Sequence, residues 1–240
     1  MKTKLSILVA LLLLPALAWA QESDAYARFA KAAGFESTLF RGARPEVYPF
    51  AYNGHFYWKS PTFKEGRVLF NGKWYGPMMM NVNAHLQEVM LKPAGNRPSM
   101  SVSSDLVDEF YIGGVHFYNL EKKGYDGVQS GFYEVVFEGR DMLLKRIVKI
   151  QMENAANNNG MPIGYDDPNY KDHVLKFFQY NRAYYFLRDG KLVQFKGKAA
   201  LKGFYKDRKK DINAFVKSHG LRQADFEPYC KAVMDYVENY

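Results

Sequence analysis

Residues 65–82 read EGRVLFNGKWYGPMMMNV and contain the pattern on which the fold depends. Two apolar runs flank the dipeptide Asn71-Gly72, and Asn-Gly supplies the two positive φ angles of a type I′ turn at low steric cost. The pattern therefore predicts a β-hairpin. Met78, Met79 and Met80 would alternate between the two faces of its second strand, because successive side chains of a strand point to opposite faces.

Comparable turn signals recur along the chain. FAYNGHFYW (50–58) and YFLRDGKLVQF (185–195) place Asn-Gly or Asp-Gly between apolar runs, and Glu138-Gly139 separates two more runs. These signals indicate about ten short strands, and the absence of helix-length segments between them argues against a parallel, doubly wound sheet. We therefore predict a curved antiparallel β-meander or partial barrel.

The C-terminal part follows a helical pattern instead. From Ala199 to Val216 the apolar residues recur on one face at about 100° per residue, and Gly220 would end this helix. Asp225 would cap a second helix, in which Cys230 lies on the apolar face. Residues 199–239 are thus predicted to form two C-terminal amphipathic helices, which makes the fold class α+β, with Cys230 as a small buried apolar residue.

The first twenty residues are typical of a secretory signal peptide. Lys2 and Lys4 precede an apolar run, and Ala18-Trp19-Ala20 has the small-residue pattern of a cleavage site. We therefore expect an exported protein, periplasmic or secreted, and no transmembrane segment after signal cleavage, since no later stretch reaches about 18 apolar residues. Because Cys230 is the only cysteine, no internal disulfide can form and the core must hold the chain together.

The expected organisation is a signal peptide over 1–20 and a single α+β domain over 21–240. Within the domain we predict the main β-meander over 45–150, a long polar loop over 151–172, further strands over 174–196 and the helices over 199–239.

Basic side chains are concentrated in the first C-terminal helix. Lys202, Lys206, Lys209 and Lys210 would lie together on the flank beside its apolar face. Such a flank is either a solvated surface or an anchor for phosphate or carboxylate groups of envelope lipids or polymers. The partner expected is thus an envelope component or a protein, and not nucleic acid, since the chain is exported.

The hairpin aromatics allow two interpretations. Trp58 and Trp74 would form either a stacking platform for a ligand or cross-strand packing contacts. Met78, Met80 and His85 could similarly bind Cu(I), but methionines that alternate along a half-buried strand are more typical of packing. We predict no metal site and no cofactor.

No sequence signature of catalysis is present. The chain lacks an H-E-x-x-H helix, a G-x-S-x-G elbow and a second cysteine, so no catalytic residue is predicted. Whether the protein is an enzyme stays uncertain, with a non-enzymatic protein that binds a ligand or partner as the leading hypothesis. The alternative is a hydrolase with a site near the 151–173 loop, where Asp166, Asp167 and His173 lie close together in sequence.

Four segments resemble a family of exported, uncharacterised β-rich envelope proteins of Gram-negative bacteria. They are EGRVLFNGKWYGPMMMNVNAHLQEVML, DEFYIGGVHFYNL, SGFYEVVFEGRDMLLKR and YYFLRDGKLVQFKGKAALKGFYKDRKKDINAFVKSHGL. The resemblance covers most of residues 45–238. It implies the β-rich fold and the envelope location, and it implies no catalytic residues.

Overall fold

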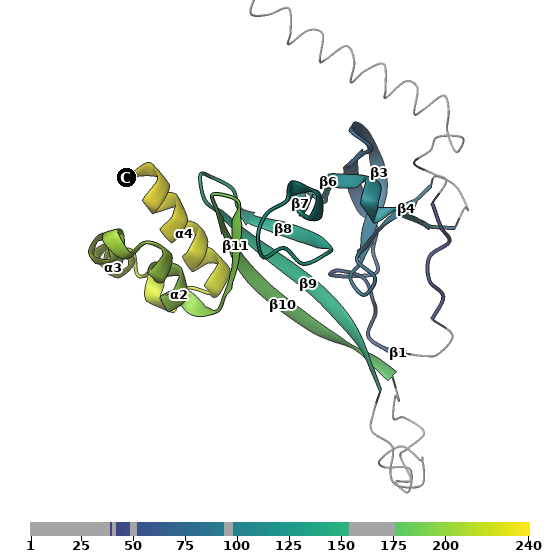
Figure 1. Ribbon diagram of the computed structural model, residues 1–240. Helices are drawn as coiled ribbons and strands as arrows, with labels where there is room; N and C mark the ends of the chain where they lie inside the picture. The colour runs from purple at the N-terminus through teal and green to yellow at the C-terminus, as the bar shows by residue number, and fades with distance from the viewer. Residues whose placement is uncertain (1–38, 40–41, 49–51, 94–97, 154–175) are drawn as a thin grey trace, which may run out of the picture.

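A computed structural model describes residue 39 and residues 42–48, 52–93, 98–153 and 176–240. The described part contains one sheet and three α-helices (Figure 1). The strands are β1 (Tyr52–Asn53), β2 (Lys64–Phe70), β3 (Lys73–Asn83), β4 (Glu88–Lys92), β5 (Met100–Val102), β6 (Val107–Ile112), β7 (Val115–Asn119), β8 (Phe132–Phe137), β9 (Met142–Glu153), β10 (Lys176–Arg188) and β11 (Lys191–Phe195). The helices are α2 (Gly197–Phe204), α3 (Lys209–Ser218) and α4 (Phe226–Asn239).

The sheet is antiparallel except at β1. Its strand order is β1-β10-β9-β8-β7-β6-β2-β3-β4-β5, with β11 also paired to β10 and β1 parallel to β10. Among the described strands the two ends of this order do not pair, so the sheet is open. The predicted α+β class with a curved antiparallel sheet is therefore confirmed.

Curvature arises where the ladder is irregular. The register between β2 and β3 shifts between Gly66 and Val68, which is the effect of a β-bulge and increases local twist. Gly66 is required there, because a Cβ atom would lie 2.1 Å from the carbonyl oxygen of Tyr111 on the neighbouring strand. Another shift, between Val135 and Phe137, bends β8 against β9.

The predicted turns are confirmed at three of four places. Asn71 and Gly72 have φ angles of 49° and 72° and join β2 to β3, and Asp189-Gly190 joins β10 to β11 in the same way. Glu138 and Gly139 lie between the paired strands β8 and β9. The hairpin predicted at Asn53-Gly54 is wrong, because the residues that follow it bond to β3 instead of folding back on β1: Trp58 N donates to the Val82 carbonyl.

The helical region differs from the prediction in one respect. The first predicted helix is interrupted between α2 and α3 by the 3₁₀ turn Lys206–Arg208. The Phe204 carbonyl accepts a hydrogen bond from Arg188, and the Tyr205 hydroxyl donates to Asp141, so the sheet draws the chain out of helical geometry at this point. Three C-terminal α-helices are therefore present instead of two.

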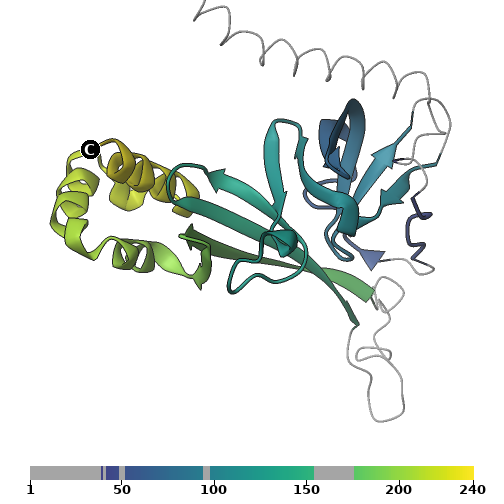
Figure 2. The ribbon, with the colours of Figure 1, turned by 45° about the horizontal axis from the view of Figure 1, so that its top comes forward.

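Apolar side chains form three clusters. On β9, Leu143 and Ile147 point to one face of the sheet, where Leu143 packs under the helices and Ile147 packs among β2–β7. Leu144 points to the opposite face and joins a smaller cluster with Tyr133 and Tyr185. Figures 1 and 2 show β9 and β10 running as a long pair from the helices to β1. The β9 strand thus contributes to all three clusters.

The methionine run alternates as predicted. Met80 is fully buried, Met78 packs against the same core, and Met79 on the other face is 42% exposed. His85 lies beyond the end of β3. The packing interpretation is therefore confirmed for Met78 and Met80. Cys230 is also buried as predicted, and burial raises the pKa of its thiol to about 12.

Met79 and Met80 offer a matched test of this alternation. We expect Met80→Ala to lower the free energy of unfolding by roughly 2 to 5 kcal/mol, because it leaves a cavity in a packed core. Met79→Ala should change it much less, by about 0.5 kcal/mol, since that side chain lies on the exposed face of the sheet and leaves no cavity in the core. Urea unfolding followed by tryptophan fluorescence measures both, and equal losses would contradict the placement of the two faces.

Candidate functional site

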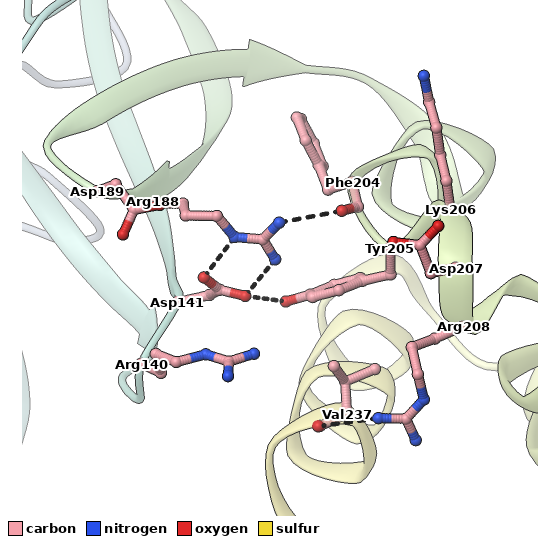
Figure 3. A pocket seen from close by; sticks show the side chains of 10 residues that line it. All are labelled: Arg140, Asp141, Arg188, Asp189, Phe204, Tyr205, Lys206, Asp207, Arg208 and Val237. Atoms are coloured by element: carbon pink, nitrogen blue, oxygen red, sulfur yellow. Dashed lines mark hydrogen bonds and ion pairs between the residues drawn. The ribbon is translucent and has the colours of Figure 1, made fainter.

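An ion pair between the buried Asp141 and the half-buried Arg188 connects the sheet to the turn between α2 and α3. Asp141 is only 5% exposed and accepts hydrogen bonds from Arg188 Nε at 2.7 Å and Nη2 at 2.5 Å. The Tyr205 hydroxyl donates to the same carboxylate at 2.9 Å. Arg188 also donates to the Phe204 carbonyl at 3.1 Å, so all three side chains are locked in place (Figure 3).

The charges of this group are strongly stabilised. Burial alone would raise the pKa of Asp141, but the hydrogen bonds from Arg188 and Tyr205 outweigh it and hold that pKa below its ordinary value. The hydrogen bond to Asp141 raises the pKa of Arg188 further. Burial, followed by the contact with Asp141, raises the pKa of Tyr205, which stays protonated as a donor. The three residues therefore form a rigid wall with no net charge.

A pocket of about 580 Å³ opens beside this wall. Arg140, from the turn between β8 and β9, and Arg208, from the 3₁₀ turn, approach the hollow from opposite sides, with Val237 of α4 between them (Figure 3). The backbone N–H of Arg140 donates to Glu238 Oε1 at 2.7 Å, which fixes the turn against α4. The Arg140 guanidinium makes no hydrogen bond or ion pair among the described residues, although its charge helps to lower the pKa of Asp141.

The other cations of the pocket are partly engaged. Arg208 Nη1 lies 3.5 Å from the Val237 carbonyl, and its Nε lies 3.4 Å from the exposed carboxylate of Asp211. Lys206 is exposed at the rim, as are Asp189 and Asp207. The lining therefore holds four cationic and three anionic side chains, an excess of one positive charge.

A second basic feature lies on α3. At about 100° per residue, Lys209, Lys217 and Lys210 follow one another on one flank of the helix, beside its buried face. All three are exposed, and Lys202 of α2 reaches the same flank by donating to Asn213 Oδ1 at 3.0 Å. Lys202, Lys209, Lys210 and Lys217 are called the basic flank below. Lys206, predicted with them, lies at the pocket instead.

The two tryptophans have different surroundings. Trp58 is 6% exposed and donates through Nε1 to Glu134 at 3.1 Å, so its ring packs in the core. Trp74 is 38% exposed, but the guanidinium of Arg67 lies 4.8 Å from its ring centre and 4.5 Å from that of Tyr111. Because these groups stack on one another, they already cover ring faces that a flat ligand would need. The arrangement is therefore better suited to packing than to binding a flat ligand.

Another buried network joins the two main clusters. Lys145 donates to Glu134 at 2.7 Å and to Glu227 of α4 at 3.0 Å, and Tyr184 donates to Glu227 at 2.7 Å. Burial would lower the pKa of Lys145, but the two carboxylates raise it above its ordinary value. Burial would raise the pKa of Glu227, but the hydrogen bonds from Tyr184 and Lys145 lower it. Lys145 and Glu227 are thus held in their charged forms, and the network ties β8 and β9 to α4.

His85 and His55 also have structural roles. His85 Nδ1 donates to the Lys149 carbonyl at 2.9 Å, and the Lys149 backbone N–H donates to the Ala84 carbonyl at 3.0 Å. The turn between β3 and β4 thus covers the edge of β9 that β8 leaves free. The Lys149 ammonium donates to the His55 carbonyl, and burial lowers the pKa of both Lys149 and His55.

Several predicted features lie outside the described residues. These are the signal peptide over 1–20 and the hydrolase candidates Asp166, Asp167 and His173. The predicted loop over 151–172 is described only to Glu153, which still belongs to β9. Within the described ranges, no group of three or more His, Cys, Asp or Glu side chains could hold a metal ion. No helix there is long and apolar enough to cross a membrane.

The sequence reasoning missed the arginine pocket. Its only trace in the sequence is that Arg140-Asp141 and Arg188-Asp189 both lie at predicted hairpin turns. Nothing in the sequence pairs Asp141 with Arg188, which are 47 positions apart. Pairing of β9 with β10 brings them together.

In comparisons with known proteins, no family model, no curated protein and no solved structure matches the chain. The resemblance to exported envelope proteins therefore stays a prediction.

Asp141→Asn tests the ion pair with Arg188. We expect it to lower the free energy of unfolding at pH 7 by about 2 kcal/mol, since it weakens charge-assisted hydrogen bonds in a buried site. Because the folded pKa of Asp141 is lowered, its contribution is complete above the ordinary value of 3.8 and is lost as the pH falls through the folded pKa.

The free energies of unfolding of the natural protein and of Asp141→Asn, measured with urea, should therefore differ by a constant amount near neutral pH. This difference should become smaller below about pH 4. Asp189→Asn, at the exposed turn position, is the matched control and should have little effect. A difference that is the same at pH 7 and pH 3 would contradict the assignment.

Proposed function

We propose that this chain is an exported, non-enzymatic binding protein of the cell envelope, and that its basic flank docks on the anionic surface of a phospholipid bilayer. The observation that carries the proposal is the concentration of charge. Residues 196–223 contain nine Lys and Arg against two Asp, while basic and acidic residues nearly balance over the rest of the chain.

The placement of these charges supports a surface contact. Lys209, Lys210 and Lys217 are exposed on the same flank, and Asp211 points to another side of α3, where it pairs with Arg208. Lysine is a flexible point charge, which suits a diffuse anionic surface better than a single planar ligand. Each such charge close to an anionic bilayer contributes about 1 kcal/mol.

The contact should be electrostatic and not inserted. Ile212 and Val216 of α3 and Leu201 of α2 are buried against the sheet and α4, so the apolar face of these helices is already occupied. Binding of this kind depends strongly on salt, because the screening length falls from about 10 Å at 0.1 M to about 3 Å at 1 M ionic strength.

Reversal of the flank charges tests the proposal. In cosedimentation with vesicles of phosphatidylglycerol and phosphatidylcholine, the chain without residues 1–20 should bind at low salt. The triple variant Lys209→Glu, Lys210→Glu, Lys217→Glu should bind at least about a hundredfold more weakly, since three favourable terms of about 1 kcal/mol become unfavourable.

The matched control reverses exposed lysines elsewhere. Lys122→Glu and Lys123→Glu change a 3₁₀ turn at Glu121–Lys123 and should leave most of the binding intact. Pure phosphatidylcholine should bind neither protein. If the flank variant still sediments with anionic vesicles as well as the unchanged chain, or binding survives 1 M salt, the proposal fails. Binding to soluble polyanions without any to vesicles would replace the bilayer as the partner.

A further inference from the structure

We infer that the arginine pocket beside Asp141 binds the singly charged phosphodiester of a lipid headgroup, between the guanidinium groups of Arg140 and Arg208. This inference deepens the proposed function and rests on it for the source of the ligand. The basic flank would supply general attraction to the bilayer, and the pocket would select one headgroup.

The first support is an unused donor in a fixed position. The Arg140 backbone N–H donates to the Glu238 carboxylate at 2.7 Å, so the turn lies against α4. The Arg140 side chain nevertheless makes no hydrogen bond or ion pair among the described residues and extends toward the hollow (Figure 3). An arginine held at its base and free at its guanidinium is suited to bind an anion, because it offers several N–H donors in a planar fork.

The second support is the arrangement of the walls. Arg140 and Arg208 enter from opposite sides, so a bound group must offer acceptor oxygens in two directions (Figure 3). A tetrahedral phosphodiester does so, because its two anionic and two ester oxygens point in four directions, whereas the two oxygens of a carboxylate lie in one plane. Arg208 is held by long contacts of 3.4 Å to the exposed Asp211 and 3.5 Å to the Val237 carbonyl, and its guanidinium lies 5.6 Å from the ring centre of Tyr236. None of these is a short hydrogen bond, so its donors can turn to a ligand.

The charge balance limits the ligand to one negative charge. Arg188 and Asp141 neutralise each other, and the lining also holds Arg140, Arg208 and Lys206 against Asp189 and Asp207, which leaves one positive charge. Asp211, 3.4 Å from Arg208, offsets part of this charge until Arg208 turns to a ligand, so a phosphodiester monoanion is favoured over a pyrophosphate. A volume of about 580 Å³ lies within the roughly 300–1,000 Å³ typical of small-molecule sites, so the ester substituents fit as well.

Glycerophosphoglycerol, the soluble headgroup of phosphatidylglycerol, is the probe. Its addition to ¹⁵N-labelled protein should shift the Nε–Hε signals of Arg140 and Arg208 in a saturable way. Arg140→Gln should weaken binding about tenfold or more, because it removes a charge-assisted contact. Its side chain is exposed and makes no hydrogen bond or ion pair among the described residues, so the thermal unfolding midpoint should change little. Arg44→Gln, an exposed arginine outside the pocket lining, is the matched control and should bind as the natural protein does.

The two proposals fail separately. Arg140→Gln that binds the headgroup normally overturns the pocket, even if the flank variant loses vesicle binding. Arg140→Gln that loses headgroup binding supports the pocket, even if the flank variant still binds vesicles. Pyrophosphate or acetate bound more tightly than glycerophosphoglycerol would overturn the ligand class. Shifts at every exposed arginine, without saturation, would show a nonspecific salt effect and would also overturn the site.

Discussion

The structure depends on the pairing of β9 with β10. This long antiparallel pair carries Leu143, Leu144 and Ile147 into three different apolar clusters, so the sheet and the helices share one strand as their common element. Lys145 lies between Leu143 and Ile147 on the same face. Its ion pairs with Glu134 and Glu227 join the sheet to α4 at the place where the two larger clusters meet.

Two groups of charged side chains are paired within the protein and serve to hold its elements together. The charges of the Lys145 network and of the Asp141–Arg188 pair have partners within the protein. They are therefore not available to a ligand. Such pairs add little net stability compared with apolar packing, but removal of one partner leaves the other buried and unpaired. Their value lies in fixing geometry: the Asp141–Arg188 pair forms the wall of the pocket, and Arg140 next to it remains available.

The positive charge that is not paired within the protein lies on the C-terminal helices. Because the apolar faces of α2 and α3 are filled by the sheet and α4, their lysines are held outward on a rigid support. The pocket borders the turn between the same helices, where Tyr205 donates to Asp141 next to the start of β9 and Arg188 at the end of β10 donates to the Phe204 carbonyl. A general electrostatic contact and a specific anion site can thus act together.

Much of the fold could be predicted from local patterns. Asn71-Gly72 and Asp189-Gly190 specify their turns because few other residue pairs adopt two positive φ angles. Met78 and Met80 could be assigned to the core because alternation along a strand is a local property. Asn53-Gly54 has the same turn chemistry but no hairpin, because the following segment finds its backbone partners on β3 instead.

The candidate site could not be predicted from local patterns in the same way. By itself the sequence determined the antiparallel class, the buried methionines, the buried Cys230 and the basic flank, all of which depend on residues near one another in the chain. Only the tertiary structure decided that α2 and α3 separate at Tyr205, that Lys206 lines the pocket, and that Arg140 and Arg208 line the same pocket. These features depend on hydrogen bonds such as that of Arg188 to Asp141, whose partners meet only when distant strands pair.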